Sequence, residues 1–173
     1  MGKALFITGT GTDIGKTYVT GLIVKKLVDA GLRAGYYKAA LSGAEVAADG
    51  TLLPGDALHV AHTAGLAAEN ATVSYIYRDP VSPHLAAQIE RRPMDFDKVE
   101  QDYHAAKERT DYLTVEGSGG IICPLRWDNE EHVILDDLVL RLELSALVVA
   151  DAGLGTINAA VLTAEHLKMR GIP

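Results

Sequence analysis

A glycine-rich run near the N-terminus carries residue types suited to holding a phosphate group. It spans Gly9–Thr17 and lies between an apolar segment and a helical pattern. Its glycines allow a tight turn whose backbone N–H groups point at phosphate oxygens, and the start of the following helix adds a positive dipole end. Lys16 can reach the outer phosphates and the Thr17 hydroxyl can bind Mg²⁺. Although Thr10 stands where the strict pattern has glycine, the run predicts a phosphate-binding loop for a Mg-nucleotide.

A second lysine, Lys38, closes another apolar segment and is followed by Ser42 and Gly43. Taken alone, a lysine at a strand end is an exposed surface residue. Beside a phosphate-binding loop, a second ammonium group can stabilise the charge on a transferring phosphoryl group. The Ser42 hydroxyl and the Gly43 amide offer contacts for a substrate. We therefore expect Lys16 and Lys38 to be the catalytic cations.

Two acidic residues follow other segments in ways that suit a metal ion. Glu116 ends an apolar strand, where an acid in a phosphate-loop protein commonly contacts the metal or its water. The glycines of the Gly117–Gly120 segment that follows let a ligand approach the backbone. Asp56 begins a helical pattern, so it serves either as a helix N-cap or as a second Mg²⁺ carboxylate.

Three further features carry weaker indications of chemistry. The Gly153–Asn158 turn either holds a carboxylate on its free N–H groups or is a plain strand-to-helix connection. His59 and His62 lie on one helix face, but too few other ligands accompany them to predict a zinc site. The single cysteine, Cys123, cannot form an intrachain disulfide and is expected to be buried packing.

Apolar segments alternate with helical patterns along the chain. The expected strands are 4–8, 35–38, 112–116 and 146–150, and the expected helices are 16–30, 56–64, 84–90, 97–109, 136–142 and 158–170. Residues 41–54 are expected to form a loop. This alternation indicates a parallel sheet covered on both faces, with ligands beyond the carboxyl ends of its strands. The residues expected at that edge are Gly9, Lys38, Glu116 and Asp151.

Length and composition limit what the chain can be. Its 173 residues suit a single domain, 1–173, and its 48% hydrophobic and 23% charged residues are typical of globular proteins. No apolar run approaches the roughly 20 residues of a membrane span, and the first residues do not resemble a signal peptide. A net charge of -7 disfavours nucleic-acid binding. With one cysteine, these features predict a cytoplasmic location without nucleic-acid or membrane partners.

Together, several segments resemble dethiobiotin synthetase, an ATP-dependent enzyme of biotin synthesis. They follow the family's order and cover nearly the whole chain. The matching segments are Gly9–Thr17, Tyr37–Gly43, Asp56-Ala57-Leu58, Ser82-Pro83-His84, Val115–Gly120 with Pro124-Leu125, and Leu154–Asn158. The resemblance implies an α/β, P-loop NTPase-type three-layer fold, with a mainly parallel sheet covered by helices on both faces.

The resemblance also implies a reaction. The family is a ligase that joins 7,8-diaminononanoate, CO₂ (or bicarbonate) and ATP to give dethiobiotin, ADP and phosphate. A carbamate oxygen attacks the γ-phosphate to give a carbamic–phosphoric anhydride, and the second amine then closes the ring. By this resemblance Lys16 and Lys38 would flank the phosphates and the carbamate. The residues that would surround Mg²⁺ are Thr17, Asp56 and Glu116.

The remaining binding positions also come from the resemblance. Ser42 and Lys38 would contact the substrate, and the Gly155–Asn158 turn would bind its carboxylate across the interface of a homodimer. The expected nucleotide-binding residues are Gly11, Thr12, Asp13, Ile14, Gly15, Lys16, Thr17, Tyr18, Asp56, Glu116, Gly117, Ser118 and Gly119. The expected substrate-binding residues are Lys38, Ser42, Gly155, Thr156, Ile157 and Asn158.

Two departures from the family's pattern bear on these expectations. Ala39 stands where the family often has proline after the strand-end lysine. Gly171-Ile172-Pro173 reads as the lead into a further strand, and the family's adenine-contacting Asn-Asp motif lies beyond that point. We therefore expect a fold that lacks its C-terminal part, an unpaired sheet edge, and weak nucleotide binding by these residues alone.

Three other functions are compatible with the phosphate loop. A related amidoligase, such as a synthetase module of cobalamin synthesis, would be supported by an amidotransferase domain with a nucleophilic cysteine. A chromosome-partitioning ATPase would carry a second lysine early in the loop, where this chain has Gly9-Thr10-Gly11. A non-catalytic nucleotide-binding module would keep its function after Lys38→Ala. The residues outside the loop must distinguish these functions.

Overall fold

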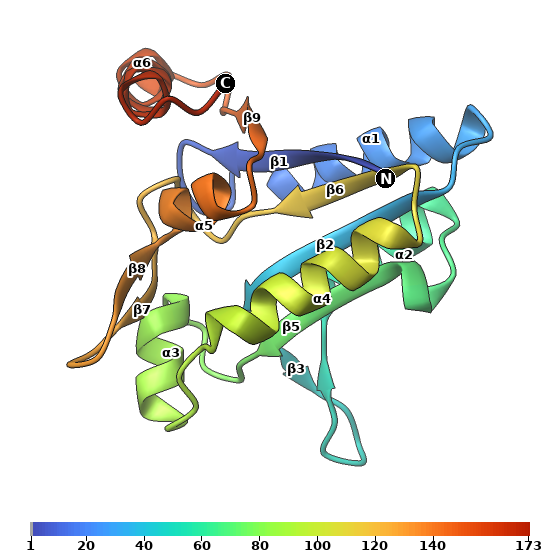
Figure 1. Ribbon diagram of the computed structural model, residues 1–173, viewed down its shortest axis with the longest axis horizontal. Coiled ribbons are helices and arrows are strands. Elements are labelled where there is room, and N and C mark those ends of the chain that lie inside the picture. The colour runs from blue at the N-terminus through green and yellow to red at the C-terminus, as the bar shows by residue number, and fades with distance from the viewer. Residues whose placement is uncertain (1) are drawn as a thin grey trace.

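A five-stranded parallel sheet forms the centre of the protein in the computed structural model, which describes residues 2–173 (Figure 1). The strand order is β5-β2-β6-β1-β9, and each neighbouring pair is parallel. These strands are β1 (Lys3–Gly9), β2 (Ala34–Leu41), β5 (Ala71–Ile76), β6 (Tyr112–Glu116) and β9 (Ser145–Val149). Because the strands are parallel, their carboxyl ends all lie at one edge of the sheet.

Helices cover both faces of this sheet, as the expected three-layer arrangement requires. On one face α1 (Lys16–Asp29) packs against α2 (Gly55–Ala64), and α4 (Phe96–Glu108) lies across the other face (Figure 1). The remaining helices are α3 (Pro83–Ile89), α5 (Leu135–Arg141), α6 (Thr156–Met169) and the short 3₁₀ turn η1 (Ala68–Asn70). No helix within residues 2–173 combines the length and apolar character needed to cross a bilayer.

Strand β2, which lies next to the central strand β6, contributes to two cores on opposite faces of the sheet. All eight of its residues are buried, which explains its nearly continuous run of small and aromatic side chains. Tyr36 packs with Val24 of α1 on one face, whereas Tyr37 packs with Val99 of α4 on the other. Since successive strand residues point to opposite faces, Lys38 projects on the same side as Tyr36, beneath α1 and α2.

All of the expected strands and helices are present, with bounds that differ by at most three residues. The expectation of a plain loop at 41–54 was wrong, because β3 (Glu45–Val46) and β4 (Leu52–Leu53) pair there as an antiparallel hairpin. Strand β5 was not expected, nor was the hairpin of β7 (Pro124–Trp127) and β8 (His132–Ile134). These segments mix polar with apolar residues because they are only partly buried.

Helix α6 lies beside β9 at one edge of the sheet (Figure 1). Leu167 is the buried residue of this helix, whereas Val161, Leu162 and Met169 are exposed. Strand β9 is one of the two edge strands of the sheet, and its Ala146 N–H donates to the Pro173 carbonyl oxygen at 2.7 Å. An apolar helix surface therefore lies open next to a sheet edge.

Candidate active site

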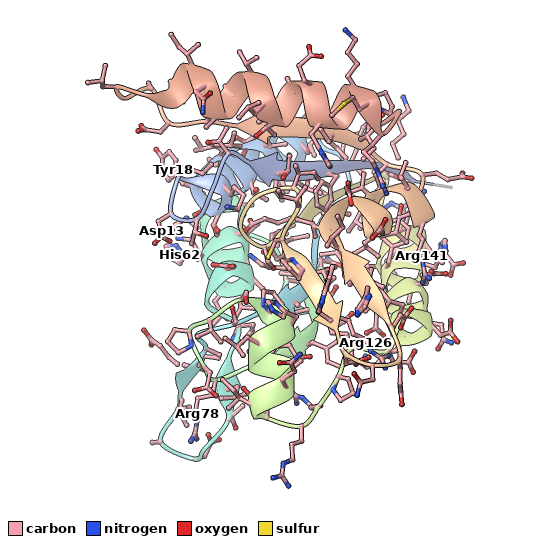
Figure 2. The ribbon with its side chains drawn as sticks, turned by 90° about the vertical axis from the view of Figure 1, so that its left-hand side faces the viewer. Asp13, Tyr18, His62, Arg78, Arg126 and Arg141 are labelled. Atoms are coloured by element: carbon pink, nitrogen blue, oxygen red, sulfur yellow. The ribbon has the colours of Figure 1, made fainter. Side chains whose placement is uncertain are left out.

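A cavity of about 410 Å³ opens where the carboxyl ends of β1, β2 and β6 meet. This edge is on the left in Figure 1 and faces the viewer in Figure 2. The residues that line the cavity are Thr12, Asp13, Gly15, Lys16, Thr17, Tyr18, Lys38, Leu41, Ser42, Asp56, Glu116, Ser118 and Gly119. All but Leu41 are residues that the sequence placed in a binding or catalytic site, so one cavity gathers segments that lie far apart along the chain.

The loop between β1 and α1 forms one wall of this cavity. Asp13 and Gly15 have φ angles of 56° and 90°, and glycine adopts this left-handed conformation without strain. Asp13 and Tyr18 lie at the outer rim (Figure 2). Lys16 begins α1 and donates from Nζ to the Gly11 carbonyl oxygen at 2.6 Å. Burial, followed by the positive charge of Lys38, lowers the pKa of Lys16, so its ammonium group would gain from a nearby anion.

Lys38 lies between two carboxylates at the floor of the cavity. Its Nζ atom is 2.5 Å from Asp56 Oδ2 and 2.8 Å from Glu116 Oε1. The Lys38 side chain is 7% exposed, that of Glu116 is 0% exposed and that of Asp56 is 34% exposed. Burial acts to lower the pKa of Lys38, but the charges of Glu116 and then Asp56 outweigh it and raise that pKa. Lys38 is therefore a buried ammonium group and not an exposed strand-end lysine.

One of these two carboxylates, that of Glu116, also contacts a hydroxyl group from α1. Thr17 donates from Oγ1 to Glu116 Oε1 at 2.9 Å. Asp56 is not the N-cap of α2, because the helix begins at Gly55 and Pro54 occupies the cap position. Its carboxylate instead pairs with Lys38. A threonine hydroxyl and two carboxylates thus converge from α1, α2 and β6, and oxygen groups of these kinds are the ones that Mg²⁺ prefers.

The segment after β6 is fixed by close contacts with the sheet. The Gly117 N–H donates to the Ile7 carbonyl oxygen at 2.9 Å, so this backbone is tied to β1. A Cβ atom at Gly117 would lie 2.7 Å from side-chain atoms of both Phe6 and Leu135, which explains why glycine is required there. Ser118 donates from Oγ to the Ala40 carbonyl oxygen at 2.7 Å. The segment therefore holds its position relative to β1 and β2.

A second cavity of about 480 Å³ adjoins the first. The two share Thr12, Asp13, Ser42, Ser118 and Gly119, and the second is also lined by Gly43, Pro80, Val81, Ser82, Pro83 and Cys123. Cys123 packs against the hydrophobic core as expected, but it is only partly buried and also lines this cavity. Burial raises the pKa of its thiol.

Sequence reasoning did not place Pro80 or Val81 at the site. Neither residue carries a chemical group that would single it out. The Ser82-Pro83-His84 segment directly after them did belong to the family resemblance, and extending that segment toward the N-terminus would have found both.

Some expected site residues do not line these cavities. Gly11 contributes a carbonyl group, and Ile14 fills the space beside Gly9, where a Cβ atom would meet Ile14 Cδ1 at 2.5 Å. Gly117 supports the site through its backbone. The Gly155–Asn158 turn lies at the start of α6, outside both cavities of its own chain, and its Ile157 side chain is exposed.

Comparisons with known proteins agree with this architecture. A family model described as an AAA domain matches residues 3–173. The ATP-dependent dethiobiotin synthetase BioD of Clostridium botulinum (strain Loch Maree / Type A3) is 51% identical over 174 residues, which span 100% of this chain and 76% of that protein. The protein of the same name from Brachyspira hyodysenteriae is 50% identical over 173 residues, which span 99% of this chain and 76% of that protein.

Among solved structures, the kinase domain of Escherichia coli tyrosine kinase ETK has a TM-score of 0.54 and 17% sequence identity. The match covers 98% of this chain and 64% of that domain, and it is a likeness of fold alone. The dethiobiotin synthetases are different, since about half of all residues are identical over the whole chain. The resemblance seen in the sequence motifs is therefore confirmed, and the chain belongs to the family of ATP-dependent dethiobiotin synthetases.

Proposed function

We propose that this chain closes the cyclic urea of dethiobiotin from 7,8-diaminononanoate, CO₂ and ATP, with release of ADP and phosphate. The observation that carries the proposal is the meeting of Lys16 and Lys38 at one cavity beside a phosphate-type loop. Both lysines belong to a chain that shares 50–51% sequence identity with proteins named ATP-dependent dethiobiotin synthetase. Two fixed ammonium groups suit a reaction that moves negative charge between a carbamate and a phosphate.

The reaction needs no protein nucleophile. One substrate amine attacks the carbon of CO₂ and loses a proton, which gives a carbamate. A carbamate oxygen then attacks the γ-phosphorus of ATP, the bond to ADP breaks, and a carbamic–phosphoric anhydride forms. The second amine attacks the carbonyl carbon of this anhydride and loses a proton, phosphate leaves, and the ring closes. Catalysis then depends on positioning the reactants and on stabilising the charge that moves.

The loop and its lysine would bind the phosphates. The backbone N–H groups before α1, together with the helix dipole, favour an anion at this point. Lys16 would exchange its contact with the Gly11 carbonyl oxygen for a phosphate oxygen. Its lowered pKa supports this role, because a phosphate group would stabilise the charge that burial and Lys38 now disfavour. Lys38, held by Asp56 and Glu116, would face the carbamate and the γ-phosphate.

The residues around Thr17 suit a Mg²⁺ ion. Its hydroxyl lies against Glu116, and Asp56 lies on the other side of Lys38. Glu116 Oε2 is buried and has no hydrogen-bond partner among residues 2–173, so this oxygen is available to a cation. We assign Thr17, Asp56 and Glu116 to hold the ion. When bound, Mg²⁺ would supply charge neutralisation at the β- and γ-phosphates.

The second cavity is the proposed place of the diamine. It adjoins the phosphate cavity through Ser42 and Ser118, so a carbamate formed there would lie next to Lys38. We propose a homodimer in which the Gly155–Asn158 turn of one copy binds the substrate carboxylate of the other. The exposed Ile157, Val161 and Leu162 side chains support this, because apolar side chains grouped on one helix favour a protein contact. The reaction would take place in the cytoplasm.

An omission assay tests the proposal. Phosphate release from Mg-ATP is measured with 7,8-diaminononanoate and bicarbonate together and with each left out in turn, and dethiobiotin is detected by mass spectrometry. We expect phosphate and dethiobiotin in equal amounts when both substrates are present and neither product at a comparable rate otherwise. Phosphate release at the same rate with and without 7,8-diaminononanoate would show that the chain is a different ATPase.

A further inference from the structure

Two of the buried side-chain oxygen atoms that have no hydrogen-bond partner among residues 2–173 lie on neighbouring strands beneath α1. They are the Tyr36 hydroxyl oxygen and Glu116 Oε2. Tyr36 is 0% exposed and Glu116 is 2% exposed, so neither side chain has ready access to bulk water. Buried polar atoms are nearly always paired in folded proteins, and each exception needs a physical reason.

The two groups lie diagonally across the neighbouring strands β2 and β6, since Tyr36 pairs with Thr114, two residues before Glu116. Lys38 and Glu116 are opposite in register, and Tyr36 lies two residues before Lys38 on the same face of β2. Burial, and then the negative charges of Glu116 and Asp56, raise the pKa of the Tyr36 phenol well above its usual value. The phenol and the Glu116 carboxylate lie on the same face of the sheet, and neither oxygen completes a hydrogen bond in this structure.

The other oxygen of the Glu116 carboxylate, Oε1, already has two hydrogen-bond donors. Oε1 accepts hydrogen bonds from Lys38 Nζ at 2.8 Å and from Thr17 Oγ1 at 2.9 Å. A phenol that stays protonated is a donor, and Oε2 is the unfilled acceptor beside it. A carboxylate oxygen offers about two acceptor sites, so Oε2 can accept the phenol proton and still face a cation.

The neighbouring tyrosine shows that this arrangement differs from ordinary packing. Tyr37 points to the opposite face of β2, and its hydroxyl lies 2.7 Å from Ser74 Oγ and donates to the Val99 carbonyl oxygen at 2.9 Å. The contacts with Ser74 and Val99 therefore satisfy the hydrogen-bonding capacity of the Tyr37 hydroxyl within the core. The Tyr36 hydroxyl lies in an otherwise apolar cluster with Val24 and Val60, where phenylalanine would pack equally well. The Glu116 carboxylate is the group that accounts for an oxygen at this point.

We propose that Tyr36 is a positioning residue for Glu116, whose hydroxyl donates to Oε2 and holds the carboxylate in the orientation that receives Mg²⁺. The inference rests on the proposed function, which assigns Glu116 to the metal. With Oε1 held by Lys38 and Thr17 and Oε2 held by Tyr36, the carboxylate cannot rotate away from the cavity. Groups that orient a ligand in this way commonly change metal affinity about 10- to 100-fold when they are removed.

The test compares the two adjacent tyrosines. Calorimetry measures ATP binding as Mg²⁺ is titrated, without 7,8-diaminononanoate, so that no turnover contributes. We expect Tyr36→Phe to raise the half-saturating Mg²⁺ concentration about tenfold, while the urea midpoint of the metal-free protein changes little. We expect the matched variant Tyr37→Phe to lower the urea midpoint, because it loses two satisfied contacts, and to leave the Mg²⁺ titration unchanged.

A third variant separates this inference from the proposed function. Glu116→Gln should also raise the Mg²⁺ requirement, and adding Tyr36→Phe to it should have no further effect. An unchanged titration for Tyr36→Phe together with a shifted one for Glu116→Gln would overturn the role of Tyr36 alone. Equal shifts in both tyrosine variants would also overturn it, since they would indicate general loosening of β2. An unchanged titration for Glu116→Gln would remove the metal assignment itself.

Discussion

Lys38 and Glu116 stand opposite each other on β2 and β6, and 2.8 Å separates Lys38 Nζ from Glu116 Oε1. The register of β2 and β6, rather than a loop, therefore places this pair at the site. Both side chains are buried, and Asp56 reaches the same ammonium group from α2. Each charge therefore depends on the others for compensation, which links the proposed chemistry to the stability of the sheet.

Removal of this ammonium group should affect activity and stability together. Lys38→Ala is expected to abolish most dethiobiotin formation, because the carbamate and γ-phosphate lose a fixed cation. It should also lower the free energy of unfolding by about 3–5 kcal/mol, since Glu116 is left as an uncompensated buried charge. Phosphate release and urea denaturation measure the two effects.

An exposed lysine gives the matched control for this variant. Lys25 pairs with Asp29 on the surface of α1, with side chains 49% and 60% exposed, so Lys25→Ala should lower the free energy of unfolding by less than about 1 kcal/mol and leave turnover intact. If Lys38→Ala kept full turnover, a non-catalytic role for this lysine would be favoured instead.

The two site lysines should respond to pH in opposite ways. The raised pKa of Lys38 means that its ion pairs stabilise the fold fully below the unfolded pKa of 10.5, and that this stability is lost as pH rises through the folded pKa above that value. The pKa of Lys16 is lowered, so burying its charged form opposes folding below the folded pKa, and this opposition disappears as pH rises.

The affinity for ATP should therefore begin to fall at a lower pH than the pH at which a free lysine loses its proton. Calorimetry from about pH 7 to about pH 10 should show affinity falling as Lys16 loses its proton, at pH values below 10.5. Lys16→Arg should retain its affinity to higher pH, because guanidinium stays charged. Identical pH profiles for the parent and this variant would remove Lys16 from the phosphate contact.

Much of the fold followed from local patterns in the sequence. The buried strands β1, β6 and β9 are short apolar runs, and helices α1 and α4 show clear spacing of apolar residues. Polar residues at the ends of such strands predicted that Lys38 and Glu116 would meet at one edge, and their contact is now seen. The two side chains meet because parallel strands place all their carboxyl ends at one edge of the sheet.

Strand β5 alternates polar with apolar residues, the pattern of a half-buried strand, and a search for continuous apolar runs does not find it. Other features depend on tertiary context that no local pattern contains. The adjacent Tyr36 and Tyr37 are equivalent in the sequence, and the packing of α1 and α4 is what gives one a carboxylate neighbour and the other a satisfied core position. The sequence allowed two roles for Asp56, because a shift of one residue in the start of α2 decides whether Asp56 is the N-cap of that helix.

The glycine after β6 should be intolerant of any side chain. Gly117→Ala would place its Cβ atom 2.7 Å from atoms of Phe6 and Leu135, which lie in the packed core. Because such overpacking displaces core side chains, we expect a loss of about 1–3 kcal/mol in the free energy of unfolding. Gly55→Ala is the control, since no atom lies within 4 Å of its added Cβ, and its urea midpoint should not fall. Equal midpoints for both variants would show that the core relaxes freely around residue 117.

The attachment of α6 should depend on one buried carboxylate. Asp136 of α5 is 0% exposed, and its Oδ2 atom lies 2.6 Å from His166 Nε2 and 3.2 Å from Arg170 Nε, both on or next to α6. Since Leu167 is the buried residue of this helix, Asp136→Asn should lower the free energy of unfolding by about 1–3 kcal/mol. Hydrogen exchange of the α6 amides should quicken more than that of β1.

Asp137→Asn provides the comparison, because Asp137 contacts Arg170 from a side chain that is 36% exposed. Its loss should change the free energy of unfolding by less than about 1 kcal/mol. The proposed substrate contact at the Gly155–Asn158 turn begins the same helix, so Asp136→Asn should also raise the KM for 7,8-diaminononanoate while the affinity for Mg-ATP stays unchanged. Unaltered exchange in α6 would show that the helix is held by Leu167 and its neighbours rather than by the buried charge.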